Sequence, residues 1–166
     1  IDLKGSIGTA TPLSCSCLAA SMMIQLARSL DQARQLAKFR LHRAIRKYLQ
    51  IHKDKIAPGE TIVCGDFNSN KRWDEWDRWW NHSDVVRELN EIGIDSVYHQ
   101  VSKEKQGEET SPTFFLYRNI EKSYHIDYVF VPKHIMNNLV KFEIGSIDEW
   151  LKLSDHLPII CEFKVE

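Results

Sequence analysis

Three short polar clusters each lie beside an apolar run and carry side chains that hydrolytic chemistry uses. In α/β folds, binding and catalytic side chains gather at strand ends. The candidate site residues are therefore the acidic, amide and imidazole groups of these clusters. The clusters are Gly65-Asp66-Phe67-Asn68, His125-Ile126-Asp127-Tyr128 and Ser154-Asp155-His156.

Each cluster, taken singly, also has a purely structural interpretation. Asp66 and Asn68 are residue types that form turns. Asp127 has the chemistry to accept backbone hydrogen bonds, and His156 to be a satisfied core histidine. The occurrence of all three clusters in this order favours a common site.

The sequences of three segments, and their order along the chain, resemble the motifs of the endonuclease/exonuclease/phosphatase superfamily. This superfamily contains exonuclease III-like nucleases, pancreatic-deoxyribonuclease-like enzymes, inositol-phosphate phosphatases and neutral sphingomyelinases. The segments that carry the resemblance are Gly65-Asp66-Phe67-Asn68-Ser69, Ile126-Asp127-Tyr128-Val129-Phe130 and Ser154-Asp155-His156-Leu157-Pro158. The resemblance implies an α/β (α+β) fold, a two-layer β-sandwich of mixed sheets flanked by helices, of which residues 26–166 resemble the C-terminal half or somewhat more.

The resemblance also implies a role for each residue in phosphate-ester hydrolysis, which needs an activated water and donors for developing charge. Asp66 would orient or deprotonate the attacking water, and Asn68 would donate to a phosphate oxygen. His156 would hydrogen-bond the phosphate, stabilising charge or acting as an acid. Asp127 would accept the other ring N–H of His156 and favour its protonated form.

Further residues are expected around this centre. Asp155 resembles a carboxylate ligand or near-ligand for Mg²⁺, with Mn²⁺ as the other candidate, because these cations prefer oxygen. Thr113 matches a recurrent family position near the substrate. His82 lies where family members build substrate loops, and we expect it either to contact substrate or to cap a helix or bridge loops.

The sequence departs from the family pattern at its N-terminal side. The family supplies an early Asn and a metal-binding Glu there, but residues 1–60 contain one glutamate, Glu60, directly before the strand that leads to Asp66. We expect residues 1–166 to be a single domain that is incomplete at its N-terminus, with 1–25 not assignable. The alternatives are a fragment, a separate N-terminal polypeptide that completes the fold, and the loss of metal catalysis.

The elements that must position these residues follow from apolar patterning. A helix-period stripe runs from Leu26 to Tyr48, and a second helix is expected from Ser83 as N-cap to Gly93. Four tryptophans within residues 73–80 fit one face of a short helix, either as packing or as a stacking platform. Pro132 is expected to open a further short helix. The expected strands are residues 61–64, 94–101, 113–117, 124–131, 141–144 and 159–165.

Composition places the chain among ordinary globular proteins. It has 166 residues, 43% hydrophobic and 27% charged, with 22 Lys plus Arg against 23 Asp plus Glu. This balance argues against a strongly basic nucleic-acid coat protein. The segment 28–55 nevertheless holds nine Lys or Arg against two Asp, either a phosphate-attracting face or the solvated face of a helix.

The cysteines and the apolar runs bear on the cellular compartment in which the protein is expected. Cys64 and Cys161 lie in apolar strands, and Cys15-x-Cys17 lacks the second pair of a zinc site. No run approaches the ~20 apolar residues of a membrane span. We expect a cytoplasmic protein.

The sequence therefore predicts a Mg²⁺-dependent hydrolase of phosphodiesters or phosphomonoesters. Its substrate would be a nucleic acid, a phosphorylated metabolite or a lipid headgroup. The alternative, motivated by the absent Glu, is a non-catalytic binding or scaffold module built on the same fold.

Overall fold

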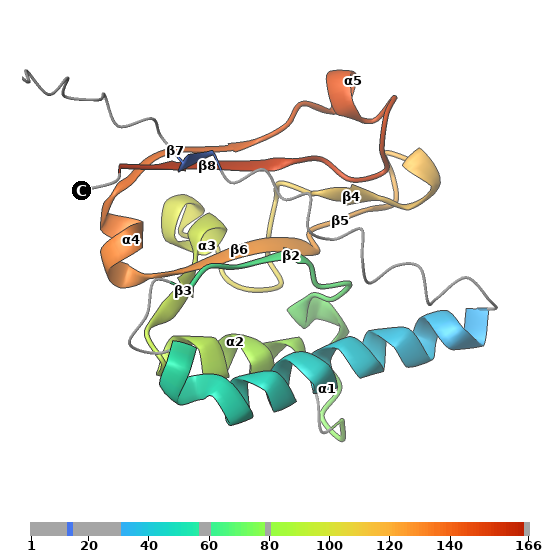
Figure 1. Cartoon of the computed structure of the whole chain (residues 1–166). Helices are drawn as coiled ribbons and strands as arrows, with labels where there is room; N and C mark the ends of the chain where they lie inside the picture. Colours follow the sequence, from blue (N-terminus) through green and yellow to red (C-terminus); the bar gives the residue numbers. More distant parts are fainter. Residues whose placement is uncertain (1–12, 15–30, 57–60, 79–80, 165–166) are drawn as a thin grey trace, which may run out of the picture.

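The computed structural model describes residues 13–14, 31–56, 61–78 and 81–164, with side chains from residue 44 onward (Figure 1). Several residues named above lie outside the described residues. They are segment 1–25 except residues 13–14, which includes Cys15 and Cys17, and also Glu60, Trp79 and Trp80. The helices are α1 (Asp31–Ile56), α2 (His82–Glu91), α3 (Val97–Ser102), α4 (Lys133–Asn137) and α5 (Ile147–Trp150). The strands are β1 (Leu13–Ser14), β2 (Val63–Asp66), β3 (Ile94–Ser96), β4 (Phe114–Phe115), β5 (Ser123–Tyr124), β6 (Asp127–Pro132), β7 (Leu139–Ile144) and β8 (Ile159–Phe163).

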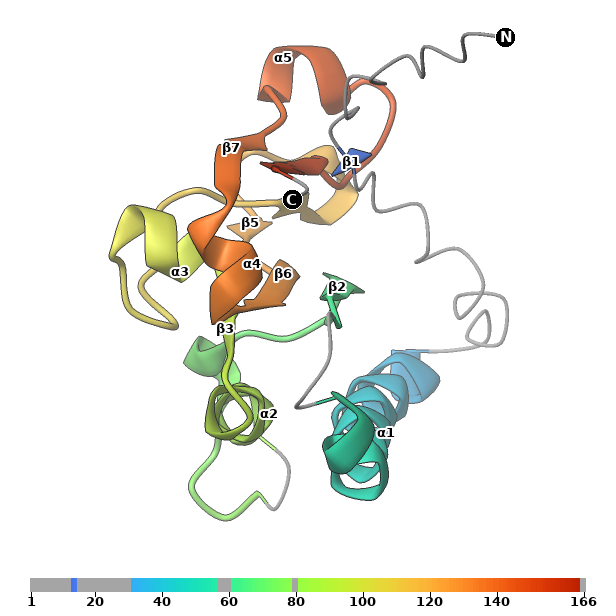
Figure 2. The ribbon, with the colours of Figure 1, turned by 60° about the vertical axis from the view of Figure 1, so that its left-hand side comes forward.

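The strands form two three-stranded sheets and one hairpin. One sheet has the order β2-β6-β3 and the other β1-β8-β7, while β4 pairs with β5. Figures 1 and 2 show the sheets as successive layers, with α1 and α2 covering the outer face of the β2-β6-β3 sheet. The expected two-layer sandwich flanked by helices is confirmed, although every described strand pair is antiparallel.

Strand β6 is the centre of the core because it is buried on both faces. Its side chains alternate between the two sides of the sheet, as the strand period of two requires. Tyr128 and Phe130 pack with the buried side chains of α1 and α2, whereas Val129 and Val131 pack with those of β8. This double burial explains why the strand reads as a nearly continuous apolar run.

Helix α2 follows the sequence pattern, whereas α1 continues to Ile56, beyond the expected end of its stripe at Tyr48. The apolar stripe of Val85, Val86 and Leu89 is buried against the sheet, and α2 ends before Gly93, whose φ of +78° favours glycine. The helix begins one residue before the expected N-cap Ser83, because Asn81 N–H donates to the Asp84 carboxylate at 3.0 Å. Helix α1 uses part of its basic face to pair Arg46 with Glu88 of α2.

The expectation of a short helix carrying the tryptophans of residues 73–80 is wrong for the residues of this segment that are described. A 3₁₀ turn ends at Trp73, and residues 74–78 are not helical. The Asp74 carboxylate accepts the backbone N–H groups of His82 and Ser83, so this segment is tied to the start of α2 instead. Trp76 is 98% exposed, and Trp73 packs on Tyr124 with ring centroids 5.1 Å apart.

The expected strand over residues 94–101 is correct only as far as Ser96. Strand β3 ends there and α3 begins at Val97, with Val97 and Tyr98 both buried. Short apolar runs of this length do not distinguish strand from helix by period alone. The other expected strands are present within a few residues, except that 113–117 shortens to β4 and 124–131 divides into β5 and β6.

Two findings concern the cysteines and the membrane. Cys161 is buried in β8 as expected, and Cys64 is half-buried in β2. Within the described ranges, no helix combines the length and the apolar character that crossing a membrane requires.

Candidate active site

The first two polar clusters meet across the β2–β6 pair. Asp66, the last residue of β2, lies directly opposite Asp127, the first residue of β6, in the antiparallel register. The pairing extends one residue further, since Phe67 N–H donates to Ile126 O at 2.9 Å. Opposite residues of an antiparallel pair have their side chains close together. The register therefore places the two carboxylates side by side at one end of the sheet.

Asn68 closes a tight turn on Asp66. Its backbone has φ +50°, in the left-handed region that asparagine tolerates better than most residues. Its backbone N–H and its side-chain amide each donate to one oxygen of the Asp66 carboxylate, both at 2.7 Å. The turn therefore presents a carboxylate and an amide donor together, with the Asn68 side chain exposed.

The third cluster is held beside the first two by the β4 strand. His156 forms an isolated antiparallel bridge with Phe114, and the two rings pack with centroids 4.6 Å apart. On either side, Phe115 N–H donates to Asp155 O at 2.8 Å and Leu157 N–H donates to Thr113 O at 2.7 Å. A loop residue is thus fixed by strand-like hydrogen bonds.

His156 and Asp127 form the hydrogen bond that the sequence predicts. The Nδ1 atom of His156 lies 2.9 Å from Oδ2 and 3.1 Å from Oδ1 of Asp127, and the His156 side chain remains 30% exposed. Because the carboxylate can only accept, Nδ1 carries a proton and Nε2 is the atom left for a ligand. Burial alone would lower the pKa of His156, but the Asp127 hydrogen bond and the charges of Asp127, Asp66 and Asp155 outweigh it and raise the pKa above 6.5.

We expect the Asp127→Asn variant to lower the pKa of His156. The substitution removes the negative charge of Asp127 and the hydrogen bond to its carboxylate, which are the main effects that oppose the lowering of the pKa by burial. An imidazole ¹H–¹⁵N titration by NMR would measure both pKa values. Glu143→Gln, which removes an exposed carboxylate from β7, is the matched control and should leave the His156 titration unchanged. An unchanged His156 pKa in Asp127→Asn would contradict the pairing.

The raised pKa also makes a contribution to stability that depends on pH. A group whose folded pKa exceeds its unfolded value stabilises the fold fully below the unfolded pKa. That stabilisation is lost as the pH rises through the folded pKa of His156. The relevant window therefore opens near pH 6.5 and extends upward.

Thr113, expected near the substrate, lies in the interior beside the segment that carries Asp127. Its side chain is 0% exposed, and its hydroxyl oxygen accepts the backbone N–H groups of Ile126 and Asp127, both at 3.1 Å. Thr113 therefore fixes the backbone from which the Asp127 carboxylate projects.

Removing the Thr113 hydroxyl should destabilise the protein. Thr113→Val leaves two buried N–H groups without their acceptor, and we expect a loss of about 1–3 kcal/mol in the free energy of unfolding. Thr113→Ser keeps the acceptor and should lose less. Urea denaturation of both variants measures the difference, and a Thr113→Val variant as stable as Thr113→Ser would contradict this role.

His82 is also buried, at 2% exposed. Its Nδ1 atom lies 2.8 Å from Ser69 Oγ and its Nε2 atom 3.1 Å from Gln106 Oε1. The structure supports the other expectation for this residue, a bridge between loops. His82 joins the start of α2 to the segment that follows the Asp66 turn.

The described residues supply oxygen donors of the kind that Mg²⁺ prefers but do not assemble a complete cation site. Asp66 and Asp155 are partly exposed carboxylates whose charges both act on His156. Among the residues described here, no three His, Cys, Asp or Glu side chains form a group able to hold a metal ion. We therefore derive no step of the chemistry through a metal.

Sequence analysis missed a buried polar group behind the site. Asn70 donates from its side chain to Glu109, to the His125 carbonyl and to the Tyr128 hydroxyl, at 2.9–3.1 Å. The feature of the sequence that could have pointed to this group is the position of Asn70 directly after the Asp66–Ser69 motif. A polar residue in that position, next to an apolar strand, has to find partners inside the protein.

A carboxylate pair and a histidine–aspartate pair thus lie at the ends of strands in a helix-flanked β-sandwich. This combination of fold and site is the one that the sequence motifs predict for the endonuclease/exonuclease/phosphatase superfamily. Comparison with solved structures supports the fold, because two solved structures superimpose on most of this chain.

One match is an AP endonuclease from Archaeoglobus fulgidus. It is 24% identical with a TM-score of 0.57, over 81% of this chain and 56% of that chain. Another is the 3′ phosphatase NExo from Neisseria, bound to a product DNA hairpin. It is 20% identical with a TM-score of 0.56, over 73% of this chain and 52% of that chain.

The matches fix the architecture at low sequence identity. The chain spans about half the length of these two solved structures. No protein-family model matches the sequence, and no curated protein matches it. The site geometry must therefore carry the functional argument.

Proposed function

We propose that this chain forms the part of a phosphate-ester hydrolase that positions the attacking water and the phosphate. The observation that carries the proposal is the His156–Asp127 pair beside Asp66, at the edge where β2 ends and β6 begins. The reaction is in-line attack of water on phosphorus. A new P–O bond forms, the ester P–O bond breaks, and the leaving oxygen gains a proton.

In this reaction His156 acts through Nε2. The Asp127 carboxylate holds the ring by Nδ1 and favours the imidazolium form, so Nε2–H is available to a phosphate oxygen or to the leaving oxygen. A charged donor of this kind stabilises the charge that develops in the transition state. The raised pKa of His156 keeps the donor protonated to higher pH than an isolated imidazole.

Asp66 and Asn68 act on the other side of the phosphate. The Asp66 carboxylate accepts a proton of the attacking water and so orients its oxygen toward phosphorus. The Asn68 amide donates to Asp66 in this structure, at 2.7 Å. With a phosphate bound, we expect the same exposed amide to donate to a phosphate oxygen.

We propose that the active protein uses Mg²⁺, with Mn²⁺ as a substitute. Asp155 and Asp66 are the described residues that would hold the cation, together with oxygen ligands from outside the described residues. When bound, the cation would neutralise charge on the phosphate oxygens.

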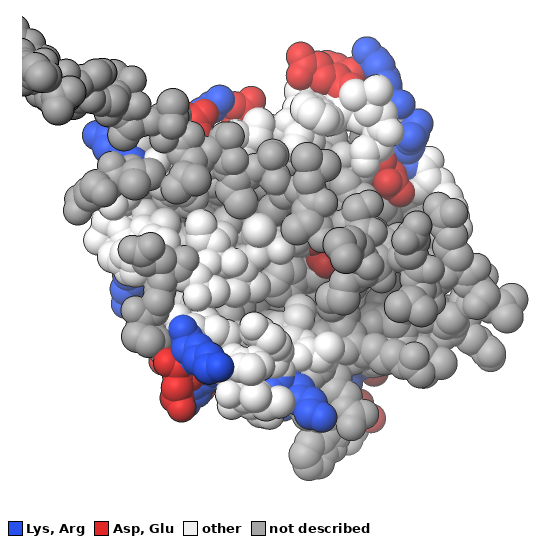
Figure 3. All heavy atoms as spheres, in the orientation of Figure 1, with Lys and Arg blue, Asp and Glu red and all other residues white. Residues whose placement is uncertain are grey.

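The substrate class remains a proposal among three: a nucleic acid, a phosphorylated metabolite and a lipid headgroup. The two matched proteins act on or bind DNA, as an AP endonuclease and a 3′ phosphatase with product DNA, which favours the nucleic acid. In the described part of the face seen in Figure 3, Lys and Arg lie in separate groups with Asp and Glu among them, not in one continuous band.

The test uses the full-length natural protein. Its activity is measured with Mg²⁺ against a short DNA, an inositol phosphate and sphingomyelin, and Mg²⁺ binding is measured by calorimetry. We expect saturable Mg²⁺ binding and hydrolysis of at least one substrate that EDTA abolishes. Absence of both would favour the non-catalytic binding module.

A further inference from the structure

Behind the Asp66–Asn68 turn, side chains from four separate segments form a closed circuit of hydrogen bonds. Ser69 Oγ lies 2.8 Å from His82 Nδ1, and His82 Nε2 lies 3.1 Å from Gln106 Oε1. Gln106 Nε2 lies 3.1 Å from His99 Nδ1.

Glu109 closes the circuit. His99 Nε2 lies 3.0 Å from Glu109 Oε1, and Asn70 Nδ2 donates to Glu109 Oε2 at 2.9 Å. Since Ser69 and Asn70 are consecutive, the circuit begins and ends at the two residues that directly follow the Asp66–Asn68 turn. We call these side chains the polar ring: Ser69, Asn70, His82, Gln106, His99 and Glu109.

The hydrogen-bond directions around the polar ring are mutually consistent. The carboxylate of Glu109 can only accept, so His99 donates from Nε2. His99 Nδ1 lies 2.8 Å from the Ser96 hydroxyl and faces the Gln106 amide nitrogen, which can only donate. The carbonyl of Gln106 then accepts from His82 Nε2, and His82 Nδ1 accepts from the Ser69 hydroxyl.

Glu109 is the charged member and the best satisfied one. Its side chain is 3% exposed. Burial alone would raise its pKa, but the hydrogen bonds from His99, Asn70 and the Gly107 N–H outweigh burial and lower the pKa to about 2. The polar ring therefore holds a buried carboxylate in its ionised form.

Asn70 connects the polar ring to the segment that carries Asp127. Besides Glu109, its amide reaches the carbonyl of His125 at 3.0 Å and the hydroxyl of Tyr128 at 3.1 Å. Those two residues flank Asp127 in the chain, and the Tyr128 hydroxyl also donates to His125 O at 3.0 Å. One amide thus spans from the Asp66 turn to the backbone that carries Asp127.

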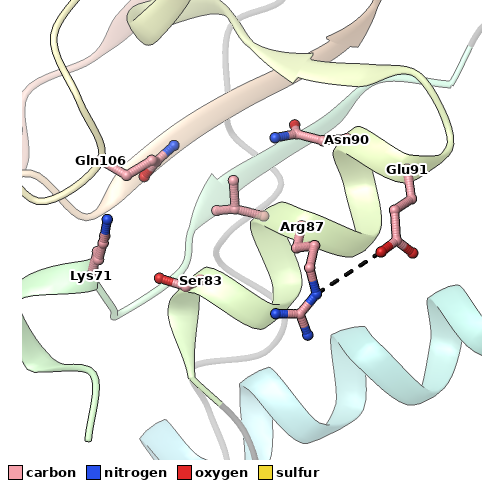
Figure 4. Close-up of a pocket in the computed structure, with 7 residues that line it drawn as sticks. Lys71, Ser83, Arg87, Asn90, Glu91 and Gln106 are labelled. Atoms are coloured by element: carbon pink, nitrogen blue, oxygen red, sulfur yellow. Dashed lines mark ion pairs between the residues drawn. The ribbon is translucent and has the colours of Figure 1, made fainter. Parts of the chain in front are cut away.

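The polar ring meets the surface at Gln106. This residue lines an open pocket of about 490 Å³ on the outer side of α2. In Figure 4, Gln106 lies across the pocket from α2, close to Lys71, while Arg87 pairs with Glu91 at 3.9 Å. The other lining residues are Ser83, Val86 and Asn90. Gln106 can therefore be replaced with less disturbance of the interior than Glu109.

We infer that Glu109 and His99 are positioning residues, which act through Asn70 and Ser69 to hold the Asp66–Asn68 turn and the Asp127 backbone in their working arrangement. This inference rests on the proposed function for its effect on catalysis, but its effect on the turn stands by itself. Neither residue touches the reacting atoms. A displacement of about 1 Å in a site of this kind costs up to about 100-fold in rate.

The test is Glu109→Gln in the full-length protein. The new amide places a donor opposite either Asn70 Nδ2 or His99 Nε2, so one link is lost while the side chain keeps its shape. We expect kcat to fall about 10- to 100-fold with little change in KM, because the residue orients catalytic groups and does not bind substrate. We also expect faster hydrogen exchange at the Asn68 amide, which donates to Asp66.

Leu89→Ala is the matched control, because it removes a fully buried side chain from the α1–α2 side of the core. It should lower the melting temperature but leave kcat and Asn68 exchange unchanged at a temperature where it is folded. If Glu109→Gln does not fold, Gln106→Leu breaks the polar ring from the pocket side and should give the same two changes.

The two readouts separate this inference from the proposed function. Faster Asn68 exchange in a protein that hydrolyses no phosphate ester would uphold the positioning role and contradict the proposed function. Unchanged kcat and unchanged exchange in the polar-ring variants would overturn the inference. Equal changes in Leu89→Ala would also overturn it, since the effect would then be loss of stability alone.

Discussion

The variant His156→Ala is expected to lower kcat/KM for a phosphate ester by about 10²- to 10⁴-fold. The imidazole is the exposed member of the His156–Asp127 pair and the group that presents an N–H to the phosphate. Its removal takes away both the charged donor and the proton for the leaving oxygen. Steady-state hydrolysis of the best substrate found for the full-length protein measures the loss.

His134→Ala provides the matched control, because His134 is an exposed histidine of α4. Its activity should equal that of the unaltered protein. The pH profile gives a second check. In the unaltered protein the rate should fall as the pH rises through the raised pKa of His156, whereas the residual rate of His156→Ala should lack this decline. A His156→Ala protein with unaltered kcat/KM would remove His156 from the chemistry.

The second large effect is expected for Asp66→Asn. This change keeps the size of the side chain but removes the negative charge that accepts a proton of the attacking water. It also places an amide where Asn68 donates twice. We expect kcat to fall by about 10²- to 10⁴-fold, as for loss of a general base.

Asp148→Asn is the control for Asp66→Asn, since it removes an exposed carboxylate from α5. The double variant Asp66→Asn, His156→Ala should be little slower than the slower single variant, because residues that act as a unit are not additive. Losses that multiply fully would indicate that the two residues act in separate steps. An Asp66→Asn protein as active as Asp148→Asn would contradict the role of Asp66.

The part of the site that was predictable from sequence is the part that strand geometry fixes. Asp66 ends β2 and Asp127 begins β6, so the antiparallel pairing of these strands is enough to bring both carboxylates together. The His156–Asp127 hydrogen bond follows once β4 holds residues 155–157 alongside. Motifs located at strand ends therefore predict which of these side chains come together.

The polar ring was not predictable because most of its members belong to no motif located at the end of a strand. His82, His99 and Glu109 come from α2, α3 and a loop, and each residue type has several common roles. The same difficulty applies to the buried positions of Thr113 and His82. Their burial depends on how α2 and β4 pack, and no local pattern reports that packing.

The measurement that tests the central claim most directly is the rate of phosphate-ester hydrolysis by the full-length protein with Mg²⁺. This rate is compared with that of the double variant that carries both Asp66→Asn and His156→Ala. The claim is that these two side chains, brought together at the β2–β6 edge, perform phosphate-ester hydrolysis. It predicts measurable hydrolysis by the unaltered protein and a loss of about 10²-fold or more in the double variant, with both proteins folded. Equal rates in the two proteins would contradict it.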